Sequence, residues 1–296
     1  MIILAPGGLG NQLFSIASAL HLAEVKNIKI KVFSDNVELV ARFIEIRKRE
    51  NLPIKVKVIF SRQRNLWLNK TSSRLHILFS KTPLMYELVR KKFLTTQIPW
   101  EFPFYLVNSS TKPPWVLRGF LQDSQLLENL SEQSRSILAK ILGVESLGDY
   151  VSEIENSRLM GVHIRRGDYN SIPDYGTLSA SYFQSTINEL KTKGLRTLIA
   201  SDDSDILKSF EGLEGYAILD PHSYTPLETM ITLAKTKYFI MSNSTFSFWI
   251  AWVISQGGGT VYAPEPWFKK SEVPRNYLYL DSFIKKPSVF EDANAS

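Results

Sequence analysis

A buried strand leads into a charged turn at residues 161–169, Gly-Val-His-Ile-Arg-Arg-Gly-Asp-Tyr. Charged side chains at the carboxyl end of a strand in an α/β protein face a ligand crevice rather than the core. The adjacent guanidinium groups of Arg165 and Arg166 suit a phosphate or diphosphate, because arginine offers a rigid fork of donors matched to such oxygens. Period-two alternation places His163 on the same face of the strand as Arg165. We therefore predict a ligand site here, the alternative being a solvated turn.

Outward from this turn, strand and helix patterns alternate along the chain, which predicts an α/β fold with mostly parallel, doubly wound sheets. The expected strands are 2–5, 28–33, 54–60, 115–121, 159–164, 195–200, 216–219, 238–241 and 260–263. The expected helices are 11–25, 37–50, 124–142, 179–193, 204–210, 226–235 and 245–255. We expect two units, 1–152 and 153–296, joined by a crossover within 143–157. A basic insertion over about 61–114 is expected to shape the mouth of a binding site.

The composition is that of a soluble globular protein and excludes several kinds of site. Of the 296 residues, 44% are hydrophobic and 22% are charged, a typical balance. There is no cysteine, so disulfides, thiolate metal sites and cysteine nucleophiles are excluded. The four histidines show no metal-ligand spacing. The sequence shows no signal peptide and no apolar run near the ~20 residues that span a bilayer. We expect a cytoplasmic protein that can lie on the inner face of the plasma membrane.

The positive charge is concentrated in the first half of the chain. Residues 1–150 hold 21 Lys and Arg against 12 Asp and Glu, a net charge of +9, whereas the rest holds 14 against 17, a net charge of −3. Such asymmetry indicates a polyanionic neighbour, which could be an anionic leaflet, a lipid phosphate or nucleic acid. A solvated basic face without any partner is the alternative.

A glycine-rich turn follows the first expected strand at residues 7–13, Gly-Gly-Leu-Gly-Asn-Gln-Leu. Its glycines let backbone amides approach a ligand at a helix N-terminus. The turn departs from the dinucleotide fingerprint, because Leu13 stands where a third glycine would be needed. A plain tight turn is the alternative. Asn11 and Gln12 are unusual at a buried helix start, so we expect them to hydrogen-bond sugar hydroxyls.

Two further polar turns follow strands of the second half. In residues 200–204, Ala-Ser-Asp-Asp-Ser, we expect Ser201 or Asp202 to cap the next helix, with a metal site as the less favoured alternative. In residues 242–245, Ser-Asn-Ser-Thr, small polar side chains at a helix N-terminus form an anion cradle, and the alternative is a simple helix cap. With the arginine turn, these segments predict a nucleotide-diphosphate pocket that needs no metal ion.

Four of these blocks resemble, in order, the motifs of the α-1,2-fucosyltransferases of glycosyltransferase family 11. Residues 163–169 resemble the family's His-x-Arg-Arg-x-Asp signature, and 7–14 resemble its opening motif. Residues 119–123, Gly-Phe-Leu-Gln-Asp, resemble its central segment, and 243–249, Asn-Ser-Thr-Phe-Ser-Phe-Trp, resemble its Asn-Ser-x-Phe-Ser-Trp-Trp block. The chain departs from the pattern at Phe248, where tryptophan is usual.

The resemblance implies a GT-B type fold, in which two Rossmann-like α/β domains face a central cleft. Residues 1–152 would be the acceptor-side domain and 153–296 the GDP-fucose-binding domain. The reaction implied is an inverting, metal-independent transfer of L-fucose from GDP-β-L-fucose to the 2-hydroxyl of a terminal β-galactoside, without a cofactor. We expect a lipid-linked acceptor for an O-antigen-like surface glycan. The alternatives are another linkage, acceptor or GDP-sugar, or a non-catalytic nucleotide- or nucleic-acid-binding protein, although no nucleic-acid-binding motif is present.

The resemblance and the chemistry of the residues together suggest their roles. Departure of GDP builds negative charge on the β-phosphate, and Arg165 is the candidate that stabilises it. No general base is obvious from the sequence, and Asp168 is the candidate. Asn11 and Gln12 would meet fucose or the acceptor hydroxyl. The expected donor-binding residues are His163, Arg166, Asp202, Glu228, Asn243, Ser244, Thr245 and Phe246.

Overall fold

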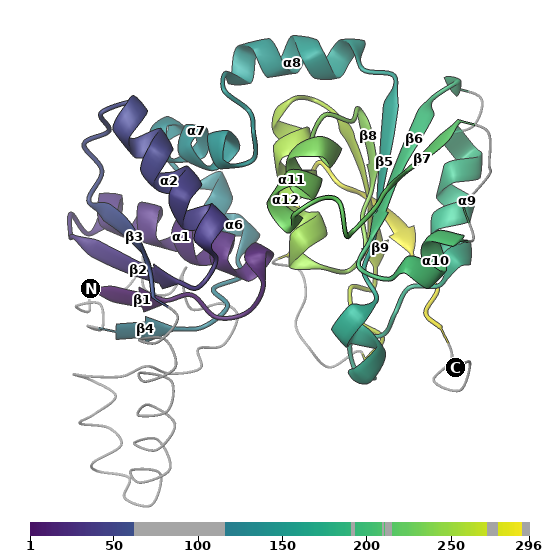
Figure 1. Ribbon diagram of the computed structural model, residues 1–296, viewed down its shortest axis with the longest axis horizontal. Helices are drawn as coiled ribbons and strands as arrows, with labels where there is room; N and C mark the ends of the chain where they lie inside the picture. Colours follow the sequence, from purple (N-terminus) through teal and green to yellow (C-terminus); the bar gives the residue numbers. More distant parts are fainter. Residues whose placement is uncertain (62–115, 191–192, 209, 211–214, 271–277, 292–296) are drawn as a thin grey trace, which may run out of the picture. The chain divides into compact units, whose positions relative to one another are not determined.

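The computed structural model describes residues 1–61, 116–190, 193–208, 210, 215–270 and 278–291. They fall into two compact units, Met1–Ile141 and Leu142–Ser296, and each unit carries its own parallel sheet (Figure 1). The α/β fold expected from the sequence is therefore confirmed. The insertion expected over about 61–114 lies, apart from its first residue, outside the described residues.

The first unit is built on a four-stranded sheet in the order β3-β2-β1-β4, with all neighbours parallel. Its strands are β1 (Ile2–Leu4), β2 (Ile30–Ser34), β3 (Val56–Phe60) and β4 (Val116–Arg118). Its described helices are α1 (Leu9–Val25), α2 (Val37–Arg49), α6 (Ser124–Glu128) and α7 (Glu132–Ile141), and they lie on one side of the sheet (Figure 1). Because the chain reverses direction across the sheet between β1 and β4, a topological switch point lies between these strands.

Helix α2 shows how the local sequence forms this layer. Asn36 caps the helix, because its side chain accepts a hydrogen bond from the backbone N–H of Leu39 at 2.9 Å. An apolar stripe at helical spacing, which includes Phe43 and Ile46, is buried. Three basic residues lie in the last turn, where they complement the negative end of the helix dipole.

The second unit is built on a six-stranded sheet in the order β10-β9-β8-β5-β6-β7, with all neighbours parallel. Its strands are β5 (Leu159–Ile164), β6 (Arg196–Ser201), β7 (Tyr216–Leu219), β8 (Tyr238–Ile240), β9 (Thr260–Glu265) and β10 (Ile284–Pro287). Its helices are α8 (Leu147–Asn156), the 3₁₀-helix η1 (Gly167–Ser171), α9 (Ala180–Leu190), α10 (Ser204–Lys208), α11 (Pro226–Leu233) and α12 (Thr245–Gln256). This is the strand order of the Rossmann fold, whose switch point falls between β5 and β8.

Strand β5 divides its residues between the two faces of this sheet. Met160, Val162 and Ile164 are buried in the hydrophobic cluster that also holds side chains of α9. Gly161 faces the opposite layer, where an added Cβ would lie 2.8 Å from Thr236 Oγ1, so the close packing there requires glycine. Helices α9 and α10 cover one face and α11 and α12 the other (Figure 1). The alternation therefore directs His163 toward α12, as the hydrogen bonds described below show.

Several elements differ from the sequence prediction. The helix expected over 124–142 is two helices, α6 and α7, separated by residues 129–131. The expected crossover 143–157 contains helix α8, and strand β10 was not predicted.

No described helix is long and apolar enough to cross a membrane.

Candidate active site

The charged turn after β5 holds the guanidinium of Arg165 between two carboxylates. Its Nη2 donates to Asp168 Oδ1 at 2.5 Å, and its Nη1 lies 2.6 Å from Asp202 Oδ2. Its Cζ lies 5.6 Å from the ring centroid of Tyr169, within the range of a cation–π contact. The Asp168 side chain is 61% exposed, against 29% for Arg165. A ligand that binds the Arg165 guanidinium can therefore take the place of the exposed Asp168 carboxylate without moving the arginine itself.

Arg166 has a different environment, because its side chain is bound by carboxylates alone in the described contacts. Nη1 and Nη2 donate to the two oxygens of Glu291 at 2.5 and 2.8 Å, and Nε donates to Asp203 Oδ2 at 3.0 Å. The hydrogen bond and charge of Glu291 raise the pKa of Arg166. Its side chain is only 16% exposed. This bidentate arrangement favours a bracing role for Arg166.

Asp202 joins the two arginines. Its Oδ1 accepts the backbone N–H of Arg166 at 2.8 Å, while its Oδ2 binds the Arg165 guanidinium. Gly167 has a φ of +21° and lies against this carboxylate, so that an added Cβ would overlap Asp202 Oδ2. The turn can therefore close on Asp202 only with glycine at this position.

The cap of α10 corrects one prediction. Neither Ser201 nor Asp202 caps the helix. Asp203 does so, because its Oδ1 accepts the backbone N–H of Asp205 at 2.8 Å. Ser201 Oγ instead accepts the backbone N–H of Asp203 at 3.0 Å, which holds the loop that carries both aspartates.

His163 is held in a buried polar pocket beneath this edge of the sheet. Its Nδ1 lies 2.6 Å from Ser247 Oγ and 3.3 Å from Ser242 Oγ. Its ring stacks on Phe246 with centroids 4.6 Å apart. Burial, with a smaller contribution from Arg165, lowers the pKa of His163 to about 3. The imidazole is therefore neutral at pH 7 and connects β5 to the start of α12.

The first turn of α12 lies at the carboxyl end of β8. Ser244 caps the helix, with its Oγ accepting the N–H of Phe246 at 3.2 Å. Asn243 donates from Nδ2 to the carbonyls of Tyr175 and Gly176 at 3.2 and 3.0 Å. Its Oδ1 is buried and has no hydrogen-bond partner in the described region. Thr245 is the first helical residue. A helix N-terminus at a switch point favours an anion through its dipole and its first backbone N–H groups.

Glu228 is used locally as a capping residue. It forms a capping box with Thr225 at the start of α11, where its Oε2 accepts the backbone N–H of Thr225 at 2.8 Å. That hydrogen bond lowers the pKa of Glu228, whose side chain is exposed.

Among the described residues, no group of three or more His, Asp or Glu side chains is arranged to hold a metal ion.

The glycine-rich turn of the first unit places Gln12 and Asn11 in different roles. Gln12 is buried and donates from Nε2 to the Gly7 carbonyl at 2.9 Å and to Asp35 Oδ1 at 2.8 Å. Its Oε1 accepts from Ser34 Oγ at 2.5 Å. The side chain of Gln12 therefore ties β1 to β2.

Asn11 lies closer to the switch point of its sheet. Its Oδ1 accepts a hydrogen bond from Gln122 Nε2 at 2.7 Å, which joins the start of α1 to the segment after β4. Gly7 has a φ of +77°, and an added Cβ would lie 2.5 Å from Asn11 Nδ2. The geometry of the turn and the position of Asn11 are thus set together.

A model of glycosyl transferase family 11 matches residues 1–281 of the chain. The chain belongs to glycosyl transferase family 11. The alpha-1,2-colitosyltransferase of Escherichia coli is 28% identical over 283 residues, covering 90% of this chain and 92% of that protein. The O-antigen biosynthesis glycosyltransferase WbnK of Escherichia coli is 24% identical over 303 residues, covering 94% and 97%. The fucosyltransferase NodZ from Bradyrhizobium superposes with a TM-score of 0.45 at 14% identity, covering 84% of this chain and 91% of that chain. A likeness at that TM-score does not assign a substrate.

In this family 11 chain, the second unit brings together three of the segments predicted from sequence. The segments 163–168, 202–203 and 243–247 lie at the carboxyl ends of β5, β6 and β8. Arg165 and Arg166 link the first segment to Asp202, and His163 links it to Ser247. Sequence reasoning missed Ser247, Asp203 and Glu291 as members of this group. Ser247 belongs to the recognised block 243–249, so its place in that motif was a usable signal. Glu291 carried no comparable signal.

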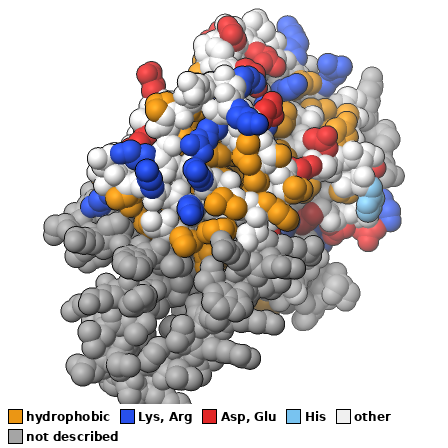
Figure 2. Space-filling model, turned by 60° about the vertical axis from the view of Figure 1, so that its left-hand side comes forward, with side chains coloured by type: hydrophobic (Ala, Val, Ile, Leu, Met, Phe, Trp, Pro, Cys, Tyr) orange, Lys and Arg blue, Asp and Glu red, His pale blue; other side chains and the backbone are white. Residues whose placement is uncertain are grey.

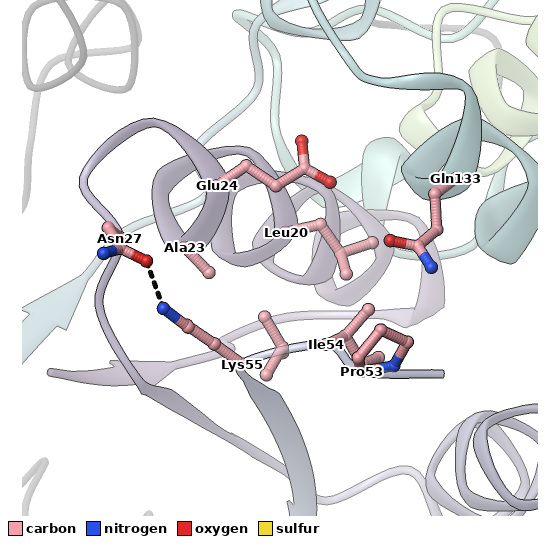
Figure 3. Close-up of a pocket in the computed structure, with 9 residues that line it drawn as sticks. Leu20, Ala23, Glu24, Asn27, Pro53, Ile54, Lys55 and Gln133 are labelled. Carbon is pink, nitrogen blue, oxygen red and sulfur yellow. Dashed lines mark hydrogen bonds between the residues drawn. The ribbon is translucent and has the colours of Figure 1, made fainter. Parts of the chain in front are cut away.

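A small pocket of the first unit lies away from its switch point (Figure 3). It encloses about 150 Å³ between the carboxyl end of α1 and the start of β3. Leu20 and Ile54 give it an apolar wall, and Lys55, whose Nζ donates to Asn27 Oδ1, lies at its rim. Because it occupies the amino edge of the sheet, it is not formed by the turns that carry the family 11 motifs.

Proposed function

We propose that this family 11 glycosyltransferase transfers L-fucose from GDP-β-L-fucose to the 2-hydroxyl of a terminal β-galactoside. The observation that carries the proposal is that Arg165 follows β5 and the N-terminus of α12 follows β8, on the two neighbouring strands that flank the switch point. A guanidinium and a helix N-terminus at the carboxyl edge of a Rossmann-ordered sheet suit the diphosphate of a nucleotide sugar. The family supports glycosyl transfer, and an α-1,2 linkage is named for the similar colitosyltransferase.

The chemistry follows from the charge that develops as GDP leaves. The acceptor oxygen bonds to the anomeric carbon of fucose as the bond from that carbon to the β-phosphate oxygen breaks, so the configuration inverts. Arg165 stabilises the negative charge gained by the β-phosphate, and the α12 N-terminus adds its dipole. No metal ion is required for this charge stabilisation.

Donor binding would also free a base. In the structure Asp168 occupies Nη2 of Arg165, and its side chain is the most exposed member of that ion-pair group. A phosphate oxygen that takes over Nη2 releases the Asp168 carboxylate beside the reacting sugar. Asp168 can then accept the proton of the acceptor hydroxyl, which completes the transfer.

We infer a GT-B arrangement in which the unit that carries Asn11 supplies the acceptor side and the unit that carries Arg165 binds the donor. Asn11 and Gln122 meet at the switch point of the first sheet, and Phe120 beside them is 38% exposed. Amide groups next to an exposed aromatic ring suit a sugar. Gln12 already makes three internal hydrogen bonds, which favours a role in shaping this site rather than in binding.

We further propose that the acceptor is lipid-linked and that the protein works on the cytoplasmic face of an anionic membrane. Lys31 of β2 and Lys57 of β3 are exposed, paired in register and therefore on the same face of the sheet, and the exposed Lys29 and Lys55 precede these two strands. No ion pair within the described residues engages them, and neighbouring like charges on adjacent strands are unfavourable without an anion. Figure 2 shows a face of the molecule on which Lys and Arg side chains lie next to hydrophobic ones.

Vesicle sedimentation tests this membrane contact. Wild-type protein should sediment with vesicles containing phosphatidylglycerol more than with phosphatidylcholine vesicles, and salt should weaken the binding. Lys31→Glu/Lys57→Glu should lose most of the difference. The matched control Lys208→Glu/Lys235→Glu makes the same charge change on exposed lysines of the second unit and should retain it. Equal loss in both double variants would reject this surface.

A second donor is favoured by the similarity to a colitosyltransferase. Colitose is L-fucose without the 3-hydroxyl, so the two GDP-sugars differ in one polar group. A site that hydrogen-bonds the 3-hydroxyl would reject GDP-colitose by several orders of magnitude, whereas an apolar contact there would discriminate only about 10–200-fold. Turnover of both donors under the same conditions decides between them.

The function is tested by measuring transfer from GDP-fucose to a panel of β-galactosides, with the linkage of the product assigned by NMR. We expect an α-1,2 product at the same rate with and without EDTA. A rate abolished by EDTA and restored by a divalent ion would reject the metal-independent reaction. No transfer to any galactoside would reject fucosyl transfer to galactosides. As a test of the nucleic-acid-binding alternative, nucleic acid should not compete with GDP for the protein.

A further inference from the structure

The end of the described chain is attached to the loop that follows η1. The backbone of Ser179 donates to Val289 O at 2.8 Å, and that of Glu291 donates to Thr177 O at 2.9 Å. Leu178 and Phe290 form an antiparallel bridge between these hydrogen bonds. Residues 288–291, which we call the C-terminal strap, therefore lie along the segment that leads from the charged turn into α9.

The strap places one carboxylate directly on the charged turn. Both oxygens of Glu291 accept from the guanidinium of Arg166, at 2.5 and 2.8 Å, and 125 residues separate the two in sequence. The Glu291 carbonyl also accepts from Lys269 Nζ at 2.7 Å, which fixes the backbone of the strap at the same point. A bidentate pair with a rigid fork defines the position and plane of the guanidinium.

The position of Arg166 controls that of Arg165 through a continuous set of contacts. Asp203 Oδ2 completes the carboxylate environment of Arg166 at 3.0 Å. The backbone N–H of Arg166 holds Asp202 Oδ1 at 2.8 Å, and Asp202 Oδ2 lies 2.6 Å from Arg165 Nη1. Glu291 is thus linked to the proposed phosphate-binding guanidinium through Arg166 and Asp202, without itself approaching the ligand.

We propose that Glu291 is a positioning residue of the donor site, which holds Arg166 in place and thereby aligns Arg165 with the leaving diphosphate. This inference rests on the proposed function for its kinetic effect, but the contacts that carry it are independent of the donor's identity. Loss of the Glu291 charge leaves Asp203 as the only carboxylate on the Arg166 guanidinium among the described contacts, and it removes a negative charge from the neighbourhood of the diphosphate. GDP should then bind as tightly as before or more tightly, while turnover falls because Arg165 is no longer held in the productive geometry.

The test compares Glu291→Gln with Glu265→Gln, a matched control. Glu265 also pairs with a basic residue near the end of the described chain, Lys285 at 2.8 Å, but its side chain is half exposed and binds neither arginine of the charged turn. Its backbone carbonyl, which accepts from Ser288 N–H, is unchanged by the substitution. We expect Glu291→Gln to lower kcat about tenfold without raising KM for the donor, whereas Glu265→Gln should match wild type. Glu291→Asp, which keeps the charge on a shorter side chain, should recover part of the lost kcat.

Amide hydrogen exchange provides a readout that needs no turnover. Peptides covering 165–171 should exchange faster in Glu291→Gln than in wild type and Glu265→Gln, and GDP binding by calorimetry should not weaken. Unchanged exchange in this segment, or Glu291→Asp no more active than Glu291→Gln, would overturn the positioning role. If wild type transfers no fucose while exchange responds as expected, the proposed function fails and the strap contact stands.

Discussion

Replacing Arg165 with alanine removes the group that we propose to stabilise the departing GDP. Two unit charges about 5 Å apart interact by about 3 kcal/mol at an effective dielectric constant of about 20. Because about 1.4 kcal/mol corresponds to a tenfold change in rate, the expected loss in kcat is about 10²- to 10³-fold. Removal of other preorganised oxyanion donors produces losses of the same order.

This loss should not arise from unfolding. The ion pairs of Arg165 join side chains that are 27–61% exposed, and exposed pairs contribute only about 0–1 kcal/mol to the free energy of unfolding. Asp202 keeps the backbone N–H of Arg166 as a partner when the guanidinium is removed. The melting temperature of Arg165→Ala should therefore lie within about 4 °C of the wild-type value.

The assay is the initial rate of fucose transfer at saturating acceptor, measured over a range of donor concentrations. Arg165→Lys is the informative companion, because it keeps the charge but loses the fork that binds two oxygens, and its kcat should lie between those of wild type and Arg165→Ala. Circular dichroism and thermal melting confirm that each variant is folded. If folded Arg165→Ala retains kcat within tenfold of wild type, the leaving-group role assigned to Arg165 is refuted.

Three further variants probe this turn and the strand that precedes it, with Gly258→Ala as a control for one of them. Asp168→Asn should lower kcat about 10²-fold while calorimetry shows GDP bound at least as tightly, and a matching loss of GDP affinity would contradict the exchange of partners at Arg165. Gly167→Ala should lower the free energy of unfolding in urea by about 1–3 kcal/mol and also reduce kcat. Gly258→Ala, at a φ of +74° with open space around it, should carry the backbone cost alone and keep kcat. His163→Gln should flatten the pH dependence of stability. Because the pKa of His163 is lowered from 6.5 to about 3 in the folded protein, the unfolded state binds the extra proton below pH 6.5. Wild type should thus lose more unfolding free energy than His163→Gln between pH 7.5 and 5, and parallel curves would contradict a buried neutral imidazole.

The sequence was sufficient to locate the helices and strands that bury one face or both faces. Strand β5 could be located because Met160, Val162 and Ile164 alternate with Gly161 and His163, and both faces of the strand are buried. Strand β10 was missed because its residues, Ile-Lys-Lys-Pro, lie at a sheet edge with none buried. An edge strand is specified by its single neighbour rather than by an apolar pattern.

Sequence reasoning located the segments of the site better than the partners of each residue. It predicted that the turns at 165–169, 201–204 and 242–245 belong to one site because each follows a strand of a parallel sheet, whose carboxyl ends lie at one edge. It could not distinguish the environments of Arg165 and Arg166. Their difference depends on Glu291, and no local pattern indicates a contact across 125 residues.

The charge balance around the two arginines bears on how the proposed site would receive a diphosphate. Four carboxylates, those of Asp168, Asp202, Asp203 and Glu291, surround the two guanidinium groups, so the group carries a net formal charge of −2. A diphosphate added to this group without any rearrangement would meet repulsion. The side chains of Asp202, Asp203 and Glu291 are 23–31% exposed, whereas Asp168 is 61% exposed, and Asp168 is the carboxylate whose departure breaks the fewest described contacts. The exchange that we propose at Arg165 would couple donor binding to release of the candidate base, so GDP binding and proton acceptance should both respond to a change at Asp168.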